Sequence, residues 1–196
     1  MKTIFDVYKN VSAWNAARYD QQLDLKLAGS LLVEEYSEYF EKPGAVDKLD
    51  ALGDISYVAL GICWKSDISS EMLEEKLNYW QDYLMDALNS MPGVQPIFLV
   101  TTFITTLADD YEFGVADSMA AILNLAAFQA SYTWGITPPL WLRTLEAICR
   151  SNDTKVVVQV ASDVKANAGN KGPNYVSPTA DLAKILNEAF LAKGVN

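Results

Sequence analysis

Six of the seven carboxylates within residues 34–54 follow helical spacing in two successive segments. The first segment reads EExxE and the second places its aspartates at i, i+3 and i+7, so each set lies on one stripe of a helix. Carboxylates at this density suit the binding of a divalent cation and the activation of a water molecule. The six residues are Glu34, Glu35, Glu38, Asp47, Asp50 and Asp54.

The helices that must position these carboxylates are predicted from the spacing of apolar residues. One helix is expected over residues 23–40, and Lys42-Pro43-Gly44 then stops it with residues that break helices. A second helix is expected over about 46–64, with apolar residues along one side. Because the connection is short, the two helices should be antiparallel neighbours whose acidic stripes can face each other.

The facing stripes would repel each other unless a cation lay between them. Lys42 and Lys48 are the only basic residues nearby, so a divalent metal ion held by oxygen atoms of both helices would resolve the repulsion. A solvated acidic face is the alternative, because most acidic runs are of that kind. Apolar residues interleave with the acidic stripe on both helices, and this pattern favours a core-facing pair with a metal site.

The composition excludes several other chemistries. The chain has no histidine, which rules out Ser-His-Asp and Cys-His nucleophiles and leaves Mg²⁺, Mn²⁺ or Ca²⁺ as the metals that carboxylates would hold. A net charge of -10 lacks the basic surface of a protein that binds nucleic acid. Cys63 and Cys149 are too few for a disulfide framework and are expected in the core of a protein from a reducing compartment.

Helical periodicity continues along most of the chain, so we predict an all-α helical bundle with a single domain over residues 1–196. Residues 155–160 form a short strand or continue a helix, and 166–178 are a loop rich in Gly, Asn and Pro. The sequence shows no signal-peptide pattern and no apolar run of membrane-spanning length, so a cytoplasmic protein without a membrane partner is expected. The further helices are expected at 71–89, 96–109, 115–133, 139–150 and 179–193.

Two polar segments near the C-terminus could bind phosphate. Residues 151–155 read SNDTK and residues 171–175 read KGPNY. Their two lysines would act as point charges, their hydroxyl groups would donate hydrogen bonds, and Gly172 would allow close backbone approach. A turn with solvated lysines is the alternative for these segments alone, but beside the acidic helices one cluster would hold a cation and the other the anion.

These motifs resemble the MazG-like superfamily of all-α nucleoside triphosphate pyrophosphohydrolases. The resemblance is carried by LLVEEYSEYF followed by DKLDALGDISYVALG, and SNDTK with KGPNYVSP is similar to the tail of its phage and bacterial phosphoribosyl-ATP-pyrophosphohydrolase-like branch. The similarity covers about residues 5–65 and 134–190. Residues 66–133 have no counterpart in it and are expected to be an inserted helical segment that adds packing or oligomer contacts, with a lid over the substrate as the alternative.

The resemblance implies a bundle of the all-α nucleotide pyrophosphatase type and a role for each acidic residue. Glu34 and Glu38 would be catalytic, with Glu34 either a metal ligand or the base that activates water. Asp47 competes with the two later aspartates for the roles of the family's second-helix acids. The implied ligands of two or more Mg²⁺ (or Mn²⁺) ions are Glu35, Glu38, Asp50 and Asp54.

A nucleotide substrate and an oligomer are implied in the same way. Family members are dimers or dimers of dimers, so a homodimer or a homotetramer is expected. Trp14 and Asn15 could stack on and hydrogen-bond the base, with core packing as the alternative for Trp14. The SNDTK and KGPNY segments would bind the substrate through Asn152, Lys155, Lys171 and Tyr175.

The expected reaction is the Mg²⁺-dependent hydrolysis of a ribo- or deoxyribonucleoside triphosphate to the monophosphate and pyrophosphate. Its expected role is nucleotide-pool control for a microbe or, in the host cytoplasm, for its virus. One alternative is a non-enzymatic oligomeric helical scaffold. Another is a phosphohydrolase of the same fold that acts on a nucleoside diphosphate or a phosphoribosyl nucleotide. The scaffold gives no reason for acidic stripes on core-facing helices.

Overall fold

The computed structural model describes residues 3–109, 114–155 and 171–194, and every regular element in these ranges is an α-helix. The prediction of an all-α helical bundle is therefore confirmed. The segment 155–160 lies outside the described residues apart from Lys155, as do residues 166–170. The helices are α1 (Ile4–Ala16), α2 (Leu25–Glu41), α3 (Ala45–Lys65), α4 (Ser70–Ser90), α5 (Ile97–Asp109), α6 (Val115–Trp134), α7 (Pro138–Asp153) and α9 (Thr179–Ala192).

Caps and breakers explain where the helices begin and end. The carboxylate of Asp24 accepts a hydrogen bond from the Leu27 amide at 3.0 Å at the start of α2. The Ser69 hydroxyl accepts one from the Met72 amide at 3.1 Å at the start of α4. Gly135 ends α6 with φ 73°, a left-handed conformation that glycine adopts without strain. Such local signals place the predicted ends within three residues of the observed ones.

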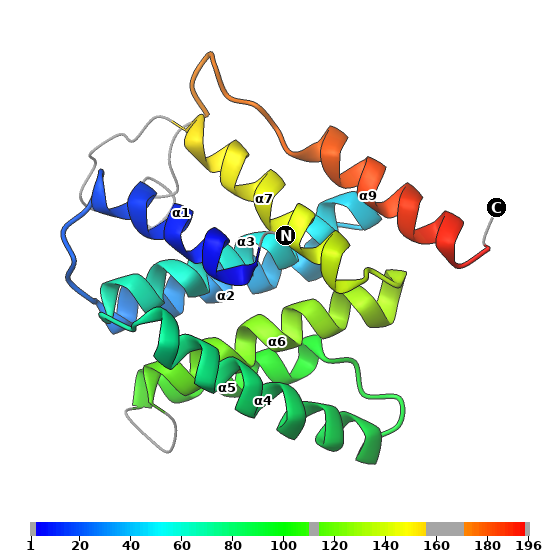
Figure 1. The fold of residues 1–196 in the computed structure, drawn as a ribbon, viewed down its shortest axis with the longest axis horizontal. Coiled ribbons are helices and arrows are strands. Elements are labelled where there is room, and N and C mark those ends of the chain that lie inside the picture. Colours follow the sequence, from blue (N-terminus) through cyan, green and yellow to red (C-terminus); the bar gives the residue numbers. More distant parts are fainter. Residues whose placement is uncertain (1–2, 110–113, 156–170, 195–196) are drawn as a thin grey trace.

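The antiparallel pair α2 and α3 forms the middle of the molecule (Figure 1). Helices α1, α7 and α9 pack against α3 on one side of this pair. On the other side α6 packs against α3 and α5 packs against α2, while α4 is the outermost helix and lies against α6. The two helices that carry the predicted carboxylates are therefore held between two layers.

Buried side chains from all of the described helices join in one hydrophobic core. The expected insertion at 66–133 is part of that core, because Met119, Ile122 and Leu125 of α6 are fully buried. Helices α3 and α7 pack closely at Gly53, where a Cβ atom would lie 2.6 Å from Cγ1 of Ile148 in α7. A methyl group there would force the two helices apart.

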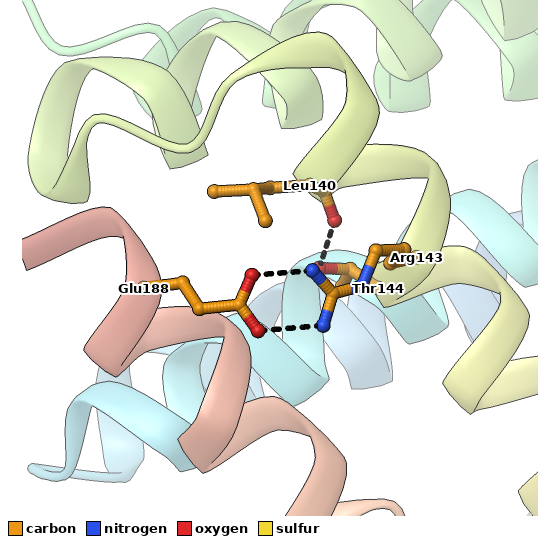
Figure 2. A network of polar contacts seen from close by, with 4 residues as sticks. All are labelled: Leu140, Arg143, Thr144 and Glu188. Atoms are coloured by element: carbon orange, nitrogen blue, oxygen red, sulfur yellow. Dashed lines mark hydrogen bonds and ion pairs between the residues drawn. The ribbon is translucent and has the colours of Figure 1, made fainter. Parts of the chain in front are cut away.

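Ion pairs and apolar contacts hold α9 on α7. The guanidinium of Arg143 binds both carboxylate oxygens of Glu188, with 2.8 Å between Nη2 and Oε1 (Figure 2). Arg150 makes a second pair with Asp181, at 3.0 Å. Both pairs are about half exposed, so solvent screens them and they contribute little to stability. The main contribution is the burial of four side chains of α9, Leu182, Ile185, Leu186 and Ala189.

Two further predictions from the sequence concern cysteines and membrane spans. Cys63 and Cys149 are free and lie buried in the core. Burial raises the pKa of both thiols to about 12, so neither is a reactive thiolate at neutral pH. No helix within the described ranges is both long and apolar enough to cross a lipid bilayer.

Candidate functional site

A cavity of about 220 Å³ lies between α2 and α3, beside the C-terminal ends of α1 and α7. We call it the α2–α3 cavity. Helix α2 lines it from Leu27 to Glu35, and α3 lines it from Asp54 to Lys65. Six residues singled out in the sequence meet in this cavity, and they are Trp14, Asn15, Glu35, Asp54, Asn152 and Lys155.

Glu35 and Asp54 bring two partly buried carboxyl groups to one end of the cavity. Burial, together with the charges of Asp54 and Glu38, raises the pKa of Glu35 to about 9. Burial, together with the repelling charge of Asp50, likewise raises the pKa of Asp54 to about 7. Neither carboxyl accepts a hydrogen bond from the described residues, so nothing in this part of the chain compensates their ionised forms fully.

Glu38 and Asp50 lie one helical turn closer to the connection between α2 and α3 than Glu35 and Asp54 do. Glu38 forms an ion pair with Lys42, which keeps the pKa of that lysine raised although burial opposes it. Burial raises the pKa of Asp50 in spite of the nearby positive charges of Lys42, Lys155 and Lys171. The two lysines from the C-terminal segments therefore act on a carboxylate of α3.

The remaining two acidic residues are at the margin. Glu34 does not line the cavity, although its charge raises the pKa of Glu35. Asp47 is exposed in the first turn of α3, where a negative charge favours the helix dipole. The four acidic residues that act on one another are called the acidic cluster below, and they are Glu35, Glu38, Asp50 and Asp54.

The acidic cluster is not a finished metal site. Among residues 3–109, 114–155 and 171–194, no three acidic or thiol side chains stand close enough together to hold a metal ion. The chemistry of the donors nonetheless fits Mg²⁺ or Mn²⁺, because all are carboxylate oxygens and burial leaves their negative charge poorly compensated. Side-chain rotation on fixed helices would be needed to bring the oxygens together.

The two polar segments predicted to bind phosphate contact each other. The Ser151 hydroxyl donates to the Tyr175 hydroxyl at 3.2 Å, and the Val176 amide donates to the Thr154 hydroxyl at 2.9 Å. Lys171 Nζ lies 5.0 Å from the centroid of the Tyr175 ring. Tyr175 and Lys171 do not line the cavity, but these contacts hold their segment against the end of α7 beside it.

Aromatic rings form one wall of the α2–α3 cavity. The Trp14 ring meets Tyr57 edge to face at 5.9 Å and Tyr19 at 5.8 Å between centroids. Arg18 Cζ lies 4.4 Å from the centroid of the Trp14 ring. The indole Nε1 donates to the Asn152 carbonyl at 3.1 Å, which ties α1 to α7. Trp14 is therefore packed as well as cavity-lining, so its two predicted roles are compatible.

Two buried amides complete the wall. Asn152 is 5% exposed, and its Nδ2 donates to the Ile148 carbonyl at 3.0 Å. Asn15 is 6% exposed, and its Nδ2 donates to the Val11 carbonyl at 2.8 Å. Each amide is thus fixed by a backbone carbonyl one turn earlier in its own helix.

Other residues of the cavity were not predicted. Tyr57, Gly61 and Lys65 line it at i+3, i+7 and i+11 from Asp54, so helical spacing would have found them. Tyr19 lies in the loop after α1, where no pattern points to a ligand. Its position depends on packing against Trp14, which the sequence does not show.

A second cavity, of about 510 Å³, lies between α1, α4, α6 and α7. Among the described residues that line it, Glu74 alone is charged, and none is a predicted site residue. It therefore lacks the facing positive and negative groups that a phosphate chain with a metal ion requires. The α2–α3 cavity is the better candidate site.

Comparisons of the chain with protein-family models, curated proteins and solved structures find no match. The resemblance to the MazG-like superfamily therefore depends on the residues quoted above. Any activity has to be argued from the acidic cluster, the cavity and the lysines beside them.

Proposed function

We propose that this protein is a magnesium-dependent nucleotide pyrophosphohydrolase, which cleaves a nucleoside triphosphate between its α- and β-phosphates. The observation that carries the proposal is that Glu35, Asp54 and Lys155 line one end of the α2–α3 cavity, while the charges of Lys155 and Lys171 act on Asp50 beside it. Buried carboxylates that repel one another are unfavourable for stability alone. A cation bound to the carboxylates and an anion bound to the lysines would relieve that repulsion.

The acidic cluster would hold Mg²⁺ through oxygen atoms from both helices. When bound, the ion would polarise phosphate oxygens and lower the pKa of a water molecule. Glu38, rather than the marginal Glu34, is the better base for that water. Its carboxylate would accept the proton as the water oxygen bonds to the α-phosphorus, and the bond from that phosphorus to the α–β bridging oxygen would break.

The positive groups would act on the leaving pyrophosphate. Lys155 lines the cavity, and the charge of Lys171 opposes the rise in the pKa of Asp50. Both would stabilise the charge that develops on the bridging oxygen. Asn152 and Tyr175 would position these lysines through the contacts at the end of α7.

We also propose the homodimer or homotetramer that the resemblance implies. Val33 and Phe40 on α2 and Phe98 on α5 are about half exposed, and the two phenylalanine rings stack at 5.9 Å. Such an apolar patch on α2 and α5 supports association between copies. Light scattering in solution would give the mass, and a monomer at micromolar concentration would contradict this part of the proposal.

The activity is tested by incubating the protein with each ribo- and deoxyribonucleoside triphosphate and Mg²⁺. Pyrophosphate and the monophosphate are the expected products. Release of orthophosphate, or turnover only of a diphosphate or a phosphoribosyl nucleotide, would favour the alternative phosphohydrolase. No turnover of any of these substrates would favour the scaffold.

A variant pair makes the assay specific to the site. Asp54→Asn removes one charge of the acidic cluster, whereas Asp47→Asn removes a charge from the exposed first turn of the same helix. We expect turnover to be lost in the first variant and kept in the second. Equal activity of both variants would mean that the acidic cluster is not the site.

A further inference from the structure

Asn15 lines the α2–α3 cavity, and only part of the hydrogen-bonding capacity of its side-chain amide is satisfied within the protein. Its Nδ2 donates to the Val11 carbonyl, and because that carbonyl can only accept, the orientation of the amide is fixed. No described residue donates to Oδ1 of Asn15, although the residue is 6% exposed and lines the cavity. Its second Nδ2 hydrogen is also uncommitted. The amide thus offers one acceptor and one donor to a ligand.

Gly61 lies alongside this amide, and the fold does not require a glycine there. A Cβ atom at Gly61 would lie 3.5 Å from Nδ2 and 3.8 Å from Oδ1 of Asn15, which is ordinary contact. The backbone at this position is not left-handed, and alanine is the better helix former. Gly53 differs, because a Cβ there would collide with Ile148.

We infer that Asn15 and Gly61 form the specificity edge of the α2–α3 cavity. Asn15 hydrogen-bonds the polar groups of a nucleobase, and Gly61, which has no side chain, leaves room for the base beside the amide. This assignment rests on the proposed nucleotide activity, because the acidic cluster at the other end of the cavity would take the phosphates.

The chemistry of the cavity fits a nucleobase rather than an aliphatic ligand. A base has a planar ring that can lie against the wall formed by Trp14, Tyr19 and Tyr57. Its edge carries an N–H group next to an acceptor, which matches the donor and acceptor of the Asn15 amide. An aliphatic chain would leave the buried amide unpaired, and that is unfavourable.

The test compares Gly61→Ala with Gly29→Ala. Gly29 is also inside a helix, but a Cβ there meets no atom within 4 Å and the residue does not line the cavity. Both variants should raise the melting temperature by roughly 1–4 °C, because alanine is the better helix former. Only Gly61→Ala should weaken binding of the preferred deoxynucleoside monophosphate, by about tenfold or more, since its methyl group occupies the space beside Asn15.

Binding is measured by calorimetry with the four deoxynucleoside monophosphates and Mg²⁺, so no hydrolysis is needed. Asn15→Ala should bring the four dissociation constants to within about threefold of one another, because the discriminating hydrogen bonds are lost. Unchanged binding by Gly61→Ala, or no binding of any monophosphate to the wild-type protein, would overturn this assignment.

The outcomes also separate this assignment from the proposed activity. Hydrolysis of triphosphates together with unchanged binding by Gly61→Ala would overturn the specificity edge alone. Base-selective binding that Gly61→Ala weakens, without any hydrolysis, would overturn the proposed activity and support the specificity edge.

Discussion

Two helix pairs in this molecule carry many acidic residues and differ in the burial and pairing of those side chains. In the pair α4 and α6, the carboxylates of α4 point into solvent, and the one partly buried acid is Asp117 of α6. Asp117 accepts a hydrogen bond from Trp80 Nε1 at 3.0 Å and pairs with Lys76 at 3.2 Å. The exposed acids of α4 are Glu71, Glu74, Glu75, Asp82 and Asp86.

In the pair α2 and α3, by contrast, Glu35 and Asp54 are partly buried, and neither receives a hydrogen bond from the described residues. In the part of the chain that the structure describes, their charges are compensated only by lysines that make no ion pair or hydrogen bond with them. A run of acidic residues therefore indicates a function only when the helix face that carries it is known. Acids that are turned outward or fully paired serve stability, whereas acids that are turned inward without partners indicate a site for a cation.

The largest expected effect is the loss of turnover in Glu38→Gln. The amide keeps the shape of the side chain but removes a charge of the acidic cluster, so the hydrolysis rate should fall by at least about 100-fold. The fold should remain, because the exchange disturbs only a surface-accessible ion pair with Lys42. Product release is followed by pyrophosphate detection, with Glu41→Gln, one turn along on the exposed end of α2, as the control. Near-wild-type activity of Glu38→Gln would show that the carboxylate of Glu38 is not part of the catalytic site.

The next effect is stabilisation by Mg²⁺. An ion that binds only the folded protein at 100 times its dissociation constant stabilises it by about 2.7 kcal/mol, which corresponds to roughly 5–10 °C in melting temperature for a chain of this size. Asp54→Asn should melt at a higher temperature than the wild type in a chelator and respond little to Mg²⁺, because one repelling charge and one ligand are gone. If millimolar Mg²⁺ does not change the melting temperature of the wild type, then α2 and α3 bind a cation no better than α4 and α6 do.

A smaller effect is expected from pH in the absence of divalent cations. The folded pKa values of Glu35 and Asp54 are raised to about 9 and about 7, so the folded state holds protons that the unfolded chain has released. The stability from these groups is complete below their unfolded pKa values near 4 and is lost as pH rises through the folded values. The chain has no histidine, so few other side chains titrate between pH 6 and 8.

We therefore expect the melting temperature in a chelator to fall by several degrees from pH 6 to pH 8. Differential scanning calorimetry at constant ionic strength measures this slope. Glu35→Gln should flatten it, whereas Glu75→Gln on α4 should leave it unchanged. A wild-type melting temperature that rises or stays level from pH 6 to pH 8 would show that other groups already compensate the negative charges of the carboxyls of α2 and α3.

Much of the fold could be predicted from the sequence because its signals are local. Apolar spacing and the breakers at 42–44 and Gly135 determine the helices, and the short turn makes α2 and α3 antiparallel. The packing of α6 on α3 was not predictable, since residues 66–133 carry no motif that says which face they cover.

The candidate site was predictable in part for the same reason. Residues three or four positions apart share a helix face, so Glu35 with Glu38 and Asp50 with Asp54 followed from spacing. Glu34 and Glu35 are neighbours about 100° apart on the helix, and only the position of α3 shows that Glu35 is the one that faces the cavity. The hydrogen bond from Trp14 to Asn152 joins residues that only the tertiary fold brings together.

The smallest effect concerns the paired acid of α4 and α6, and its sign is opposite to that at Asp54. Asp117→Asn should lower the melting temperature by roughly 2–5 °C, because it weakens the hydrogen bond from Trp80 and the ion pair with Lys76 at once. Thermal melts in a chelator at pH 8 compare it with Asp54→Asn and with Glu75→Gln, which should change little. Stabilisation by Asp117→Asn would mean that buried carboxylates are unfavourable throughout this fold, and the raised pKa values of Glu35 and Asp54 would then lose their meaning as the mark of a cation site.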